Sequence, residues 1–487
     1  MKILLECFEC KVSELYIQSL VLLYLPLEKF GKDDSDSELY VNIKKQENSF
    51  FGKAHLVYQN EKISCDFFGN YESFPAHLDK AKNFAGKLII ELFKKRFGFV
   101  PKWGMLTGVR PTRFAFDLSE NGFSDRETVK LLCENYLVDP KKAELSVGIS
   151  KIDKAVFDDS EEREYSLYVG IPFCPTRCKY CSFVSCATDK LKSLLPDYIE
   201  KLLKEIESVR RVSDNCGLKL KSIYVGGGTP SILDEHLLSS FLFKLRETNP
   251  ENDIEFTFEA GRPDTVSEQK LSYMREYGVG RVCINTQTTD NKILASVGRG
   301  HTFEQYVSAF HLAKKYGFSV NTDLIAGLPR ESLSGFCKSV DDCIKLCPEN
   351  ITVHSFSLKK SSDYTVCGTS ISQNDNTFSQ MLEYSETALS SAGYFPYYMY
   401  KHKNTAGNLE NTGYSNSEKA IGLYNVYMME GVHTVIACGA GASSKLVSRD
   451  RKSKNIYNPK YPYEYLSDWC DIHKKEKEII DFYENTY

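Results

Sequence analysis

Three cysteines on one short stretch are the residues of this chain best suited to chemistry. Cys174, Cys178 and Cys181 follow one another with three and then two residues between them. A single loop can turn thiolates at such spacings toward one point, and thiolates are the usual ligands of iron–sulfur clusters. A four-iron cluster usually takes four thiolates, so three leave one iron open to a further ligand. The stretch therefore predicts a four-iron cluster with one iron available for chemistry.

Two other interpretations of these cysteines remain open. A zinc site would need a fourth Cys or His, and Cys186 lies five residues after Cys181. A chance grouping is the second alternative. We favour the iron–sulfur cluster because residues further along the chain suit a bound organic cofactor.

A regular alternation of strands and helices must position the cysteines. Helix-length stretches separate the strand candidates, and one of them begins at Pro196, a residue typical of helix starts. Such alternation predicts an α/β fold, here a partial (β/α)6 TIM-like barrel, with functional residues at the carboxyl ends of its strands. The strand candidates are residues 166–172, 222–226, 254–260, 281–286, 319–326 and 350–358.

Polar and glycine residues follow these strands at the expected end. The run Gly226 to Pro230 allows backbone groups to approach a ligand, although a glycine-rich turn is also an ordinary loop. Glu259 and Asp323 are carboxylates suited to ribose hydroxyls or an ammonium group, and each has a capping or solvated acid as its alternative. Gln287 and Arg299 suit the carboxylate of a cofactor.

Length and composition bound the class of protein. A chain of 487 residues predicts two or three domains. We place them at residues 1–160 (an N-terminal α/β domain), 161–375 (the barrel) and 376–487 (a small C-terminal module). The net charge of −4 argues against a nucleic-acid-binding protein. No apolar run approaches the ~18 residues of a membrane span and no export signal is recognisable, so we expect a cytoplasmic protein with reduced cysteines.

One segment departs from the charge balance. Residues 79–113 carry a local excess of lysine and arginine, and Arg110 and Arg113 flank a turn with a proline. Such a segment could face an anionic ligand, and a solvated helix face is the alternative.

The motifs together resemble a known family. The three cysteines, with Tyr180 directly before the last, resemble the signature of radical S-adenosylmethionine (SAM) enzymes. Residues 168–174, 226–230, 299–302 and 323–329, with Gln287, are similar to the oxygen-independent coproporphyrinogen III dehydrogenases and their heme-chaperone relatives. Residues 106–112, 259–265, 406–414 and 438–445 most resemble the HemZ-like subgroup.

The resemblance implies the cofactors and their ligands. Cys174, Cys178 and Cys181 would bind three irons of a 4Fe-4S cluster, and S-adenosyl-L-methionine would occupy the fourth. The barrel would be of the radical SAM type, and the C-terminal module would lie on the substrate side. The positions matching contacts to S-adenosylmethionine are Tyr168, Tyr180, Gly227, Gly228, Thr229, Glu259, Gln287, Arg299 and Asp323.

The resemblance also implies a reaction. An electron from the cluster cleaves the sulfonium, and the 5'-deoxyadenosyl radical takes hydrogen from a propionate of coproporphyrinogen III. Loss of carbon dioxide and one electron leaves a vinyl group, and two rounds give protoporphyrinogen IX in anaerobic heme biosynthesis. The implied partners are this porphyrinogen substrate and an electron donor such as flavodoxin or ferredoxin, with no nucleic acid and no membrane span.

One departure from the family pattern keeps two alternatives open. The best-known dehydrogenases have a further cysteine two residues past the third, where this chain has Phe183. The heme-chaperone branch shares this feature, so a heme chaperone is the first alternative. A radical SAM methyltransferase that degrades heme is the second.

Overall fold

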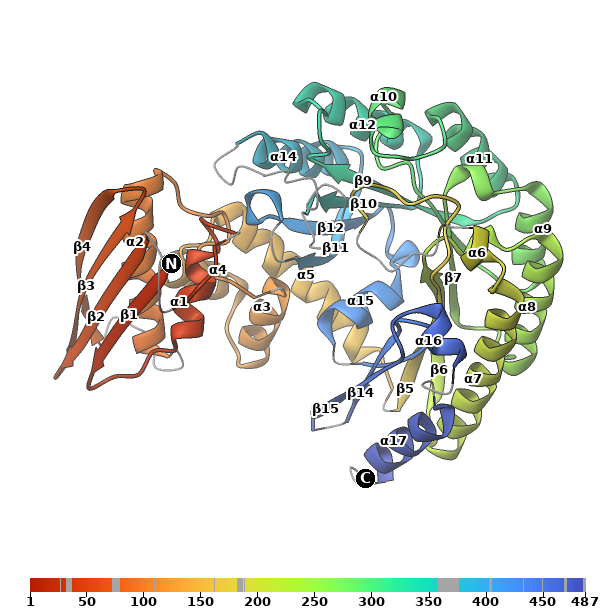
Figure 1. Cartoon of the computed structure of the whole chain (residues 1–487), viewed down its shortest axis with the longest axis horizontal. Coiled ribbons are helices and arrows are strands. Elements are labelled where there is room, and N and C mark those ends of the chain that lie inside the picture. Colours follow the sequence, from red (N-terminus) through yellow and green to blue (C-terminus); the bar gives the residue numbers. More distant parts are fainter. Residues whose placement is uncertain are drawn as a thin grey trace. The chain divides into compact units, whose positions relative to one another are not determined.

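The computed structural model shows two compact units (Figure 1). Unit 1 comprises Met1–Lys151, Ile371–Ser379 and Tyr400–Glu410, and unit 2 comprises Ile152–Ser370, Gln380–Met399 and Asn411–Tyr487. Cys186 and Phe183 lie outside the residues that the structure describes. These are residues 1–26, 28–31, 37–71, 79–108, 110–161, 163–181, 187, 189–357, 376–402, 405–431, 433–448, 450–467 and 471–484.

Unit 1 contains a four-stranded sheet in the order β1-β2-β3-β4. β1 (Lys2–Phe8) pairs parallel with β2 (Glu38–Gln46), and β3 (Ser49–Tyr58) pairs antiparallel with β2 and with β4 (Glu61–Asn70). Buried and less buried residues alternate along β2 and β3, as in a sheet with one face on the core.

Helix α2 (Lys80–Phe97) supplies much of the core of unit 1. Asp79 caps its first turn by accepting from the Lys82 backbone N–H, and Gly98 ends it in the left-handed conformation. The remaining helices are α1 (Glu14–Val21), α3 (Pro111–Glu120), α4 (Asp125–Tyr136) and α5 (Pro140–Asp158), whose last residues belong to unit 2.

Unit 2 is built on six parallel strands that run side by side in chain order. Each strand lies within a few residues of its predicted place, so the prediction of a partial parallel barrel is confirmed. Helices cover the outer side of the strands (Figure 1), and apolar side chains of strands and helices form the core of unit 2. They are β5 (Glu164–Ile171), β6 (Lys219–Gly227), β7 (Glu255–Gly261), β8 (Arg281–Ile284), β9 (Ser319–Ala326) and β10 (Asn350–Ser355).

The helices of unit 2 alternate with these strands. α7 begins at Leu195 with Pro196 in its first turn, and its stripe of Ile199, Leu202 and Ile206 is buried against the sheet. The others among the described residues are α6 (Asp189–Lys192), α8 (Glu235–Thr248), α9 (Glu268–Glu276), α10 (Asn291–Ser296), α11 (Phe303–Lys315), α12 (Leu333–Leu346), α14 (Asn376–Ser391), α15 (Leu423–Glu430), α16 (Pro462–Leu466) and α17 (Ile472–Glu484). The first residues of α14 belong to unit 1.

Strands from the C-terminal part extend the same sheet at both edges, giving eleven strands. β12 (Glu410–Ser415) pairs antiparallel with β10, and β13 (Thr434–Cys438) pairs parallel with β5. β11 (Phe395–Lys401), β14 (Ser443–Val447) and β15 (Ser453–Tyr457) complete the sheet.

The three-part domain division remains a prediction. Among the described residues, no helix is long and apolar enough to cross a membrane.

A fully buried carboxylate fastens the C-terminal segment to α7. Glu205 accepts hydrogen bonds from the Gly439 backbone N–H (2.8 Å) and the Tyr465 hydroxyl (2.7 Å), and it pairs with Lys475 (2.7 Å). Gly439 in turn lies against the end of β5, because a Cβ there would be 2.3 Å from the Gly170 carbonyl oxygen. Glu205 therefore supports the strand that leads into the cysteine stretch.

We predict that Glu205→Ala lowers the free energy of unfolding by about 3–5 kcal/mol, because the buried Lys475 ammonium loses its partner. Urea unfolding followed by circular dichroism measures the change. Glu200→Ala on the same helix is the control, because its pair with Lys204 is exposed to solvent and contributes little to stability. A Glu205→Ala protein that unfolds like the wild type would show that apolar contacts alone hold the C-terminal segment.

Candidate functional site

The three cysteines lie on one loop that follows β5, residues 172–181, which we call the cysteine loop. Cys178 is buried, Cys174 and Cys181 are partly buried, and the Cys181 backbone N–H donates to the Cys178 carbonyl at 3.0 Å. Within the described ranges, no group of three or more Cys, His, Asp or Glu side chains is gathered as a metal-ligand set. The structure places the cysteines on a common loop, and their individual roles as iron ligands stay a prediction.

The glycine loop after β6 is bonded directly to this cysteine loop. The Gly228 N–H donates to the Ile171 carbonyl (3.0 Å) and the Thr229 N–H donates to the Phe173 carbonyl (2.7 Å). A Cβ at Gly228 would lie 2.5 Å from the same Phe173 oxygen, and Gly227 has a φ of +111°. The glycines are therefore required for the close approach of the two loops.

Glu259 joins the glycine loop to the interior of the barrel. It accepts from the Tyr224 hydroxyl (2.5 Å) and from the Gly227 N–H (3.2 Å). Loss of surrounding water raises the pKa of Glu259 to about 7, the nearby Asp323 carboxylate adds to this, and the Tyr224 hydrogen bond opposes it. Glu259 is thus poised between its neutral and charged forms near neutral pH.

Asp323 on β9 has the opposite shift. Burial would raise its pKa, but the hydrogen bond and charge of His354 and the Asn321 amide hold the pKa below its usual value. His354 Nε2 lies 3.6 Å from Asp323 Oδ2, and Asn321 Nδ2 lies 2.9 Å from Oδ1. The site therefore contains one carboxylate that stays charged beside one that titrates.

Three tyrosine rings stack beside Glu259. Tyr224 and Tyr424 are nearly parallel with centroids 4.4 Å apart, and Tyr168 lies 6.2 Å from each of them. Tyr424 comes from α15, whose first backbone N–H groups donate to the Glu255 carboxylate. The stack gives the site an aromatic wall with contributions from the barrel and from the C-terminal part of the chain.

Arg299 connects the cysteine loop to two strand ends. Its guanidinium donates to the Tyr180 hydroxyl (2.9 Å), the Asn285 carbonyl (2.6 Å) and the Gly261 carbonyl (3.2 Å). Gln287 has an unusual φ of +74°, which its backbone bonds to Asp323 and Ile325 on β9 maintain. Backbone strain of this kind is concentrated at functional sites.

Several buried polar atoms near Arg299 have no hydrogen-bond partner within the part of the chain that the structure describes. They are Asn285 Oδ1, Gln287 Oε1, Arg299 Nε and both ring nitrogens of His301. Burial lowers the pKa of His301 to about 3, so its ring is neutral at pH 7. Unpaired buried polar atoms are costly, and this grouping fits the polar end of a bound ligand.

Sequence reasoning missed several residues of this site. Tyr224 precedes Gly226 by two positions, so strand alternation could have placed both on one face. His354 lies within the predicted sixth strand (residues 350–358) and could have been found in the same way. No local signal identifies Tyr424, because its place depends on contacts between α15 and the barrel.

The two arginines of the basic segment lie at the start of α3 in unit 1. Arg110 precedes the first residue of the helix, and Arg113 pairs with Asp117 at 2.8 Å and lies over the Phe116 ring. Contact of these arginines with an anionic ligand remains a prediction.

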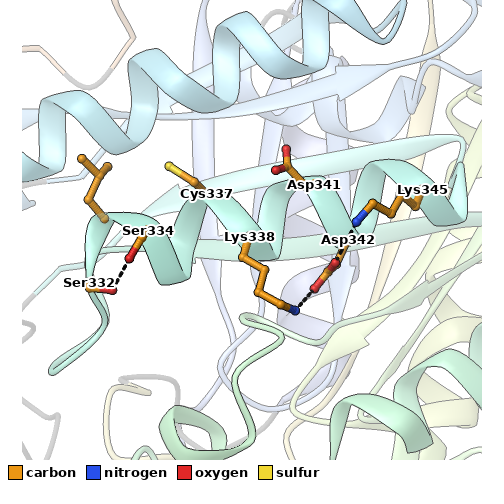
Figure 2. A pocket seen from close by; sticks show the side chains of 8 residues that line it. Ser332, Ser334, Cys337, Lys338, Asp341, Asp342 and Lys345 are labelled. Carbon is orange, nitrogen blue, oxygen red and sulfur yellow. Dashed lines mark hydrogen bonds and ion pairs between the residues drawn. The ribbon is translucent and has the colours of Figure 1, made fainter.

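A surface pocket on α12 lies apart from the predicted site residues. Figure 2 shows that Lys338 and Lys345 both reach Asp342, so these charges are paired within the helix. The pocket shares no residue with the site described above, and we assign it no function. It is lined by Ser332, Leu333, Ser334, Cys337, Lys338, Asp341, Asp342 and Lys345.

Comparison with known proteins identifies the family. Residues 168–343 match the model of the Radical SAM superfamily. The chain is 35% identical over 399 residues to the oxygen-independent coproporphyrinogen-III oxidase-like protein HemZ of Bacillus subtilis, which covers 79% of this chain and 78% of that protein. The chain belongs to this HemZ-like family of radical SAM proteins. The resemblance stated from the sequence is thereby confirmed.

Two further proteins are similar to this chain. The heme chaperone HemW of Haemophilus influenzae is 29% identical over 307 residues, 62% of this chain and 75% of that protein. The solved coproporphyrinogen III oxidase HemN of Escherichia coli, a radical SAM enzyme, aligns with a TM-score of 0.50 and 22% identity over 65% of this chain and 71% of that one. The likeness to HemN confirms the fold.

The family determines the cofactors, which are a 4Fe-4S cluster and S-adenosylmethionine. The residues present fit both of them. Three cysteines on one loop are the correct donor type for the cluster, and the unpaired polar atoms beside Arg299 fit a polar ligand. The contacts of individual residues with S-adenosylmethionine stay predictions.

The shifted pKa of Glu259 predicts a pH-dependent stability. Between pH 4.5 and about 7 the folded protein holds a proton that the unfolded chain has released. The protonated Glu259 therefore contributes to the free energy of unfolding at low pH, and this contribution is lost as the pH rises to about 7. We expect Glu259→Gln to remove up to about 3 kcal/mol of this decrease in the free energy of unfolding.

Urea unfolding at several pH values between 5 and 8 measures this effect. Glu247→Gln, which replaces an exposed carboxylate on α8, is the control and should keep the wild-type slope. A Glu259→Gln protein with that same slope would contradict the raised pKa.

The contact between the two loops predicts a second effect. Gly228→Ala should separate them, and a displacement of about 1 Å is enough to weaken a preorganised site. We expect the anaerobically reconstituted variant to hold clearly less iron and sulfide than the wild type, as measured by chemical analysis. Gly280→Ala is the control because its Cβ would be 3.9 Å from the Phe256 carbonyl oxygen, an ordinary contact. Equal iron content in both variants would rule out the requirement for glycine.

Proposed function

We propose that this chain catalyses the oxygen-independent oxidative decarboxylation of coproporphyrinogen III. Two of the propionates become vinyl groups, and the product is protoporphyrinogen IX in heme biosynthesis. Membership of the HemZ-like family supports the proposal, because the relative in Bacillus subtilis is named as a coproporphyrinogen-III oxidase-like protein. The electron donor in this proposal is a small one-electron carrier such as flavodoxin or ferredoxin.

The observation on which the proposal depends is the polar site next to the cysteine loop. Gln287, Arg299 and His301 are buried there with unpaired polar atoms, and Arg299 bonds directly to Tyr180 of the cysteine loop. A radical reaction needs its reactants held close together and away from water. Residues bonded to the cysteine loop satisfy this need better than a remote pocket would.

When bound, the cluster and S-adenosylmethionine supply an electron and a 5'-deoxyadenosyl radical that takes hydrogen from the substrate. The chain's own residues would bind these cofactors and orient them. Arg299 and Gln287 would hold the carboxylate of the methionine moiety, and Glu259 and Asp323 would accept from ammonium or ribose hydroxyl groups. The rings of Tyr168, Tyr224 and Tyr424 would exclude water beside them.

A heme chaperone is the second candidate. The similarity to HemW over 62% of this chain favours it, as does Phe183 at the position where the best-known dehydrogenases have a further cysteine. In that case the barrel and its cofactors would be retained while heme is delivered to an acceptor protein.

Anaerobic turnover distinguishes these functions. Reduced protein loaded with its cluster is incubated with S-adenosylmethionine and coproporphyrinogen III, and the products are identified by chromatography and mass spectrometry. We expect two molecules of carbon dioxide for each protoporphyrinogen IX, and none with Cys178→Ser, in which the buried predicted iron ligand is lost.

Other outcomes would overturn the proposal. Formation of deoxyadenosine without a vinyl product would exclude the decarboxylation. Stoichiometric heme binding with transfer to an acceptor and no carbon dioxide would establish the chaperone, and loss of heme absorbance under reducing conditions would establish heme degradation.

A further inference from the structure

A buried arginine beside the cysteine loop has no role in the site as described so far. Arg262 directly follows β7 and is only 3% exposed. The register between β7 and β8 shifts between Glu259 and Gly261, and Gly261 has a φ of +68°. Arg262 therefore follows an irregularity in the strand pairing, a feature that is common next to active sites.

The side chain of Arg262 connects two loops. Its Nη1 donates to Thr176 Oγ1 at 2.5 Å, and Thr176 lies between Cys174 and Cys178. Its Nε and Nη2 donate to the two carboxylate oxygens of Asp264 at 2.9 and 2.6 Å. This two-point pairing fixes the plane of the guanidinium and directs the remaining nitrogen at the cysteine loop.

A third loop leaves room for this arrangement. A Cβ on Gly300 would lie 2.7 Å from Arg262 Nη2, so any larger residue there would push the guanidinium aside. The end of α10, which leads into this third loop, is bonded to the cysteine loop: the Lys179 N–H donates to the Val297 carbonyl (3.0 Å) and Lys179 Nζ to the Ser296 carbonyl (2.8 Å). Arg262 therefore lies where the three loops meet.

Hydrogen bonds anchor the backbone on both sides of this irregularity. Ser231 Oγ, which is fully buried, donates to the Ala260 carbonyl and lies 2.5 Å from Thr265 Oγ1. Thr265 Oγ1 donates to the Arg262 carbonyl at 2.8 Å. Because its backbone is held in this way, Arg262 has a rigid base from which to position a more exposed residue such as Thr176.

We propose that Arg262 is a positioning residue for the iron–sulfur cluster, holding the cysteine loop through Thr176 with its own orientation set by Asp264 and Gly300. A loop held at its centre keeps its thiols available to the metal and slows cluster release. The proposal depends on the cluster and not on the reaction of the porphyrinogen, so it applies equally to an oxidase and to a chaperone.

The test measures cluster retention and the environment of the cluster. Full-length wild type, Arg262→Ala, Arg262→Lys and Thr176→Val are reconstituted anaerobically. Iron release to a chelator is then followed, and the electron paramagnetic resonance (EPR) spectrum and midpoint potential of the cluster are recorded. Loss of one charge-assisted hydrogen bond corresponds to about tenfold, so we expect about tenfold faster release from Arg262→Ala and Thr176→Val, with altered spectra.

The double variant isolates the bond between the two residues. The effects of Arg262→Ala and Thr176→Val should add up to less than their sum, because both changes remove the contact between these residues; Thr176→Val also removes the hydrogen bond from Thr176 Oγ1 to the Gly298 carbonyl (3.5 Å). Gly300→Ala should behave like Arg262→Ala although it leaves every charge in place. Arg262→Lys retains the charge without the planar fork and should recover only part of the wild-type retention.

Two controls keep the proposal falsifiable. Arg275→Ala removes an exposed arginine on α9 and should release iron at the wild-type rate. If Arg262→Ala does not fold, Thr176→Val at an exposed position still tests the contact. Wild-type iron release and an unchanged spectrum for Thr176→Val, or fully additive effects in the double variant, would overturn the proposal. Its failure would leave the turnover assay unaffected.

Discussion

Two backbone hydrogen bonds between the cysteine loop and the glycine loop are the interaction on which the candidate site depends. They run from Gly228 and Thr229 to the carbonyls of Ile171 and Phe173. The adjacent Gly227 N–H orients the Glu259 carboxylate, which in turn orients the Tyr224 hydroxyl. A change in the glycine loop would therefore reach the cysteines on one side and the aromatic wall on the other.

The site also contains several groups whose conformation or burial lowers the stability of the folded protein. Gln287 has a left-handed backbone, and its side-chain oxygen is unpaired, as are both nitrogens of His301 among the residues described. Burial removes water from Glu259, and this raises its pKa more than its hydrogen bonds to Tyr224 and Gly227 and the charge of His354 lower it. These costs are grouped in one place, as expected where function overrides stability. Glu205 is also a buried carboxylate, but it is paired with Lys475 and accepts from the Tyr465 hydroxyl, and its role is to stabilise the fold.

Much of this arrangement follows from the sequence, and the reasons for the rest are physical. The barrel strands were predictable because alternation with helices and glycine-rich strand ends are local patterns. The place of Tyr424 was not, since it depends on the capping of α15 by Glu255 on β7. Nor was the place of Arg262, because the register between β7 and β8 shifts just before it. The extension of the sheet by β12 and β13 rests on long-range pairing, which no local pattern reveals.

The central claim is that the cysteine loop and the strand ends beside it form one site for the cluster and S-adenosylmethionine. The EPR spectrum of the reduced, reconstituted protein, recorded with and without S-adenosylmethionine, tests this claim most directly. The account predicts a spectrum that changes when S-adenosylmethionine is added, because it would bind at the open iron. A protein with about four irons per chain and a spectrum that does not respond to S-adenosylmethionine would contradict it.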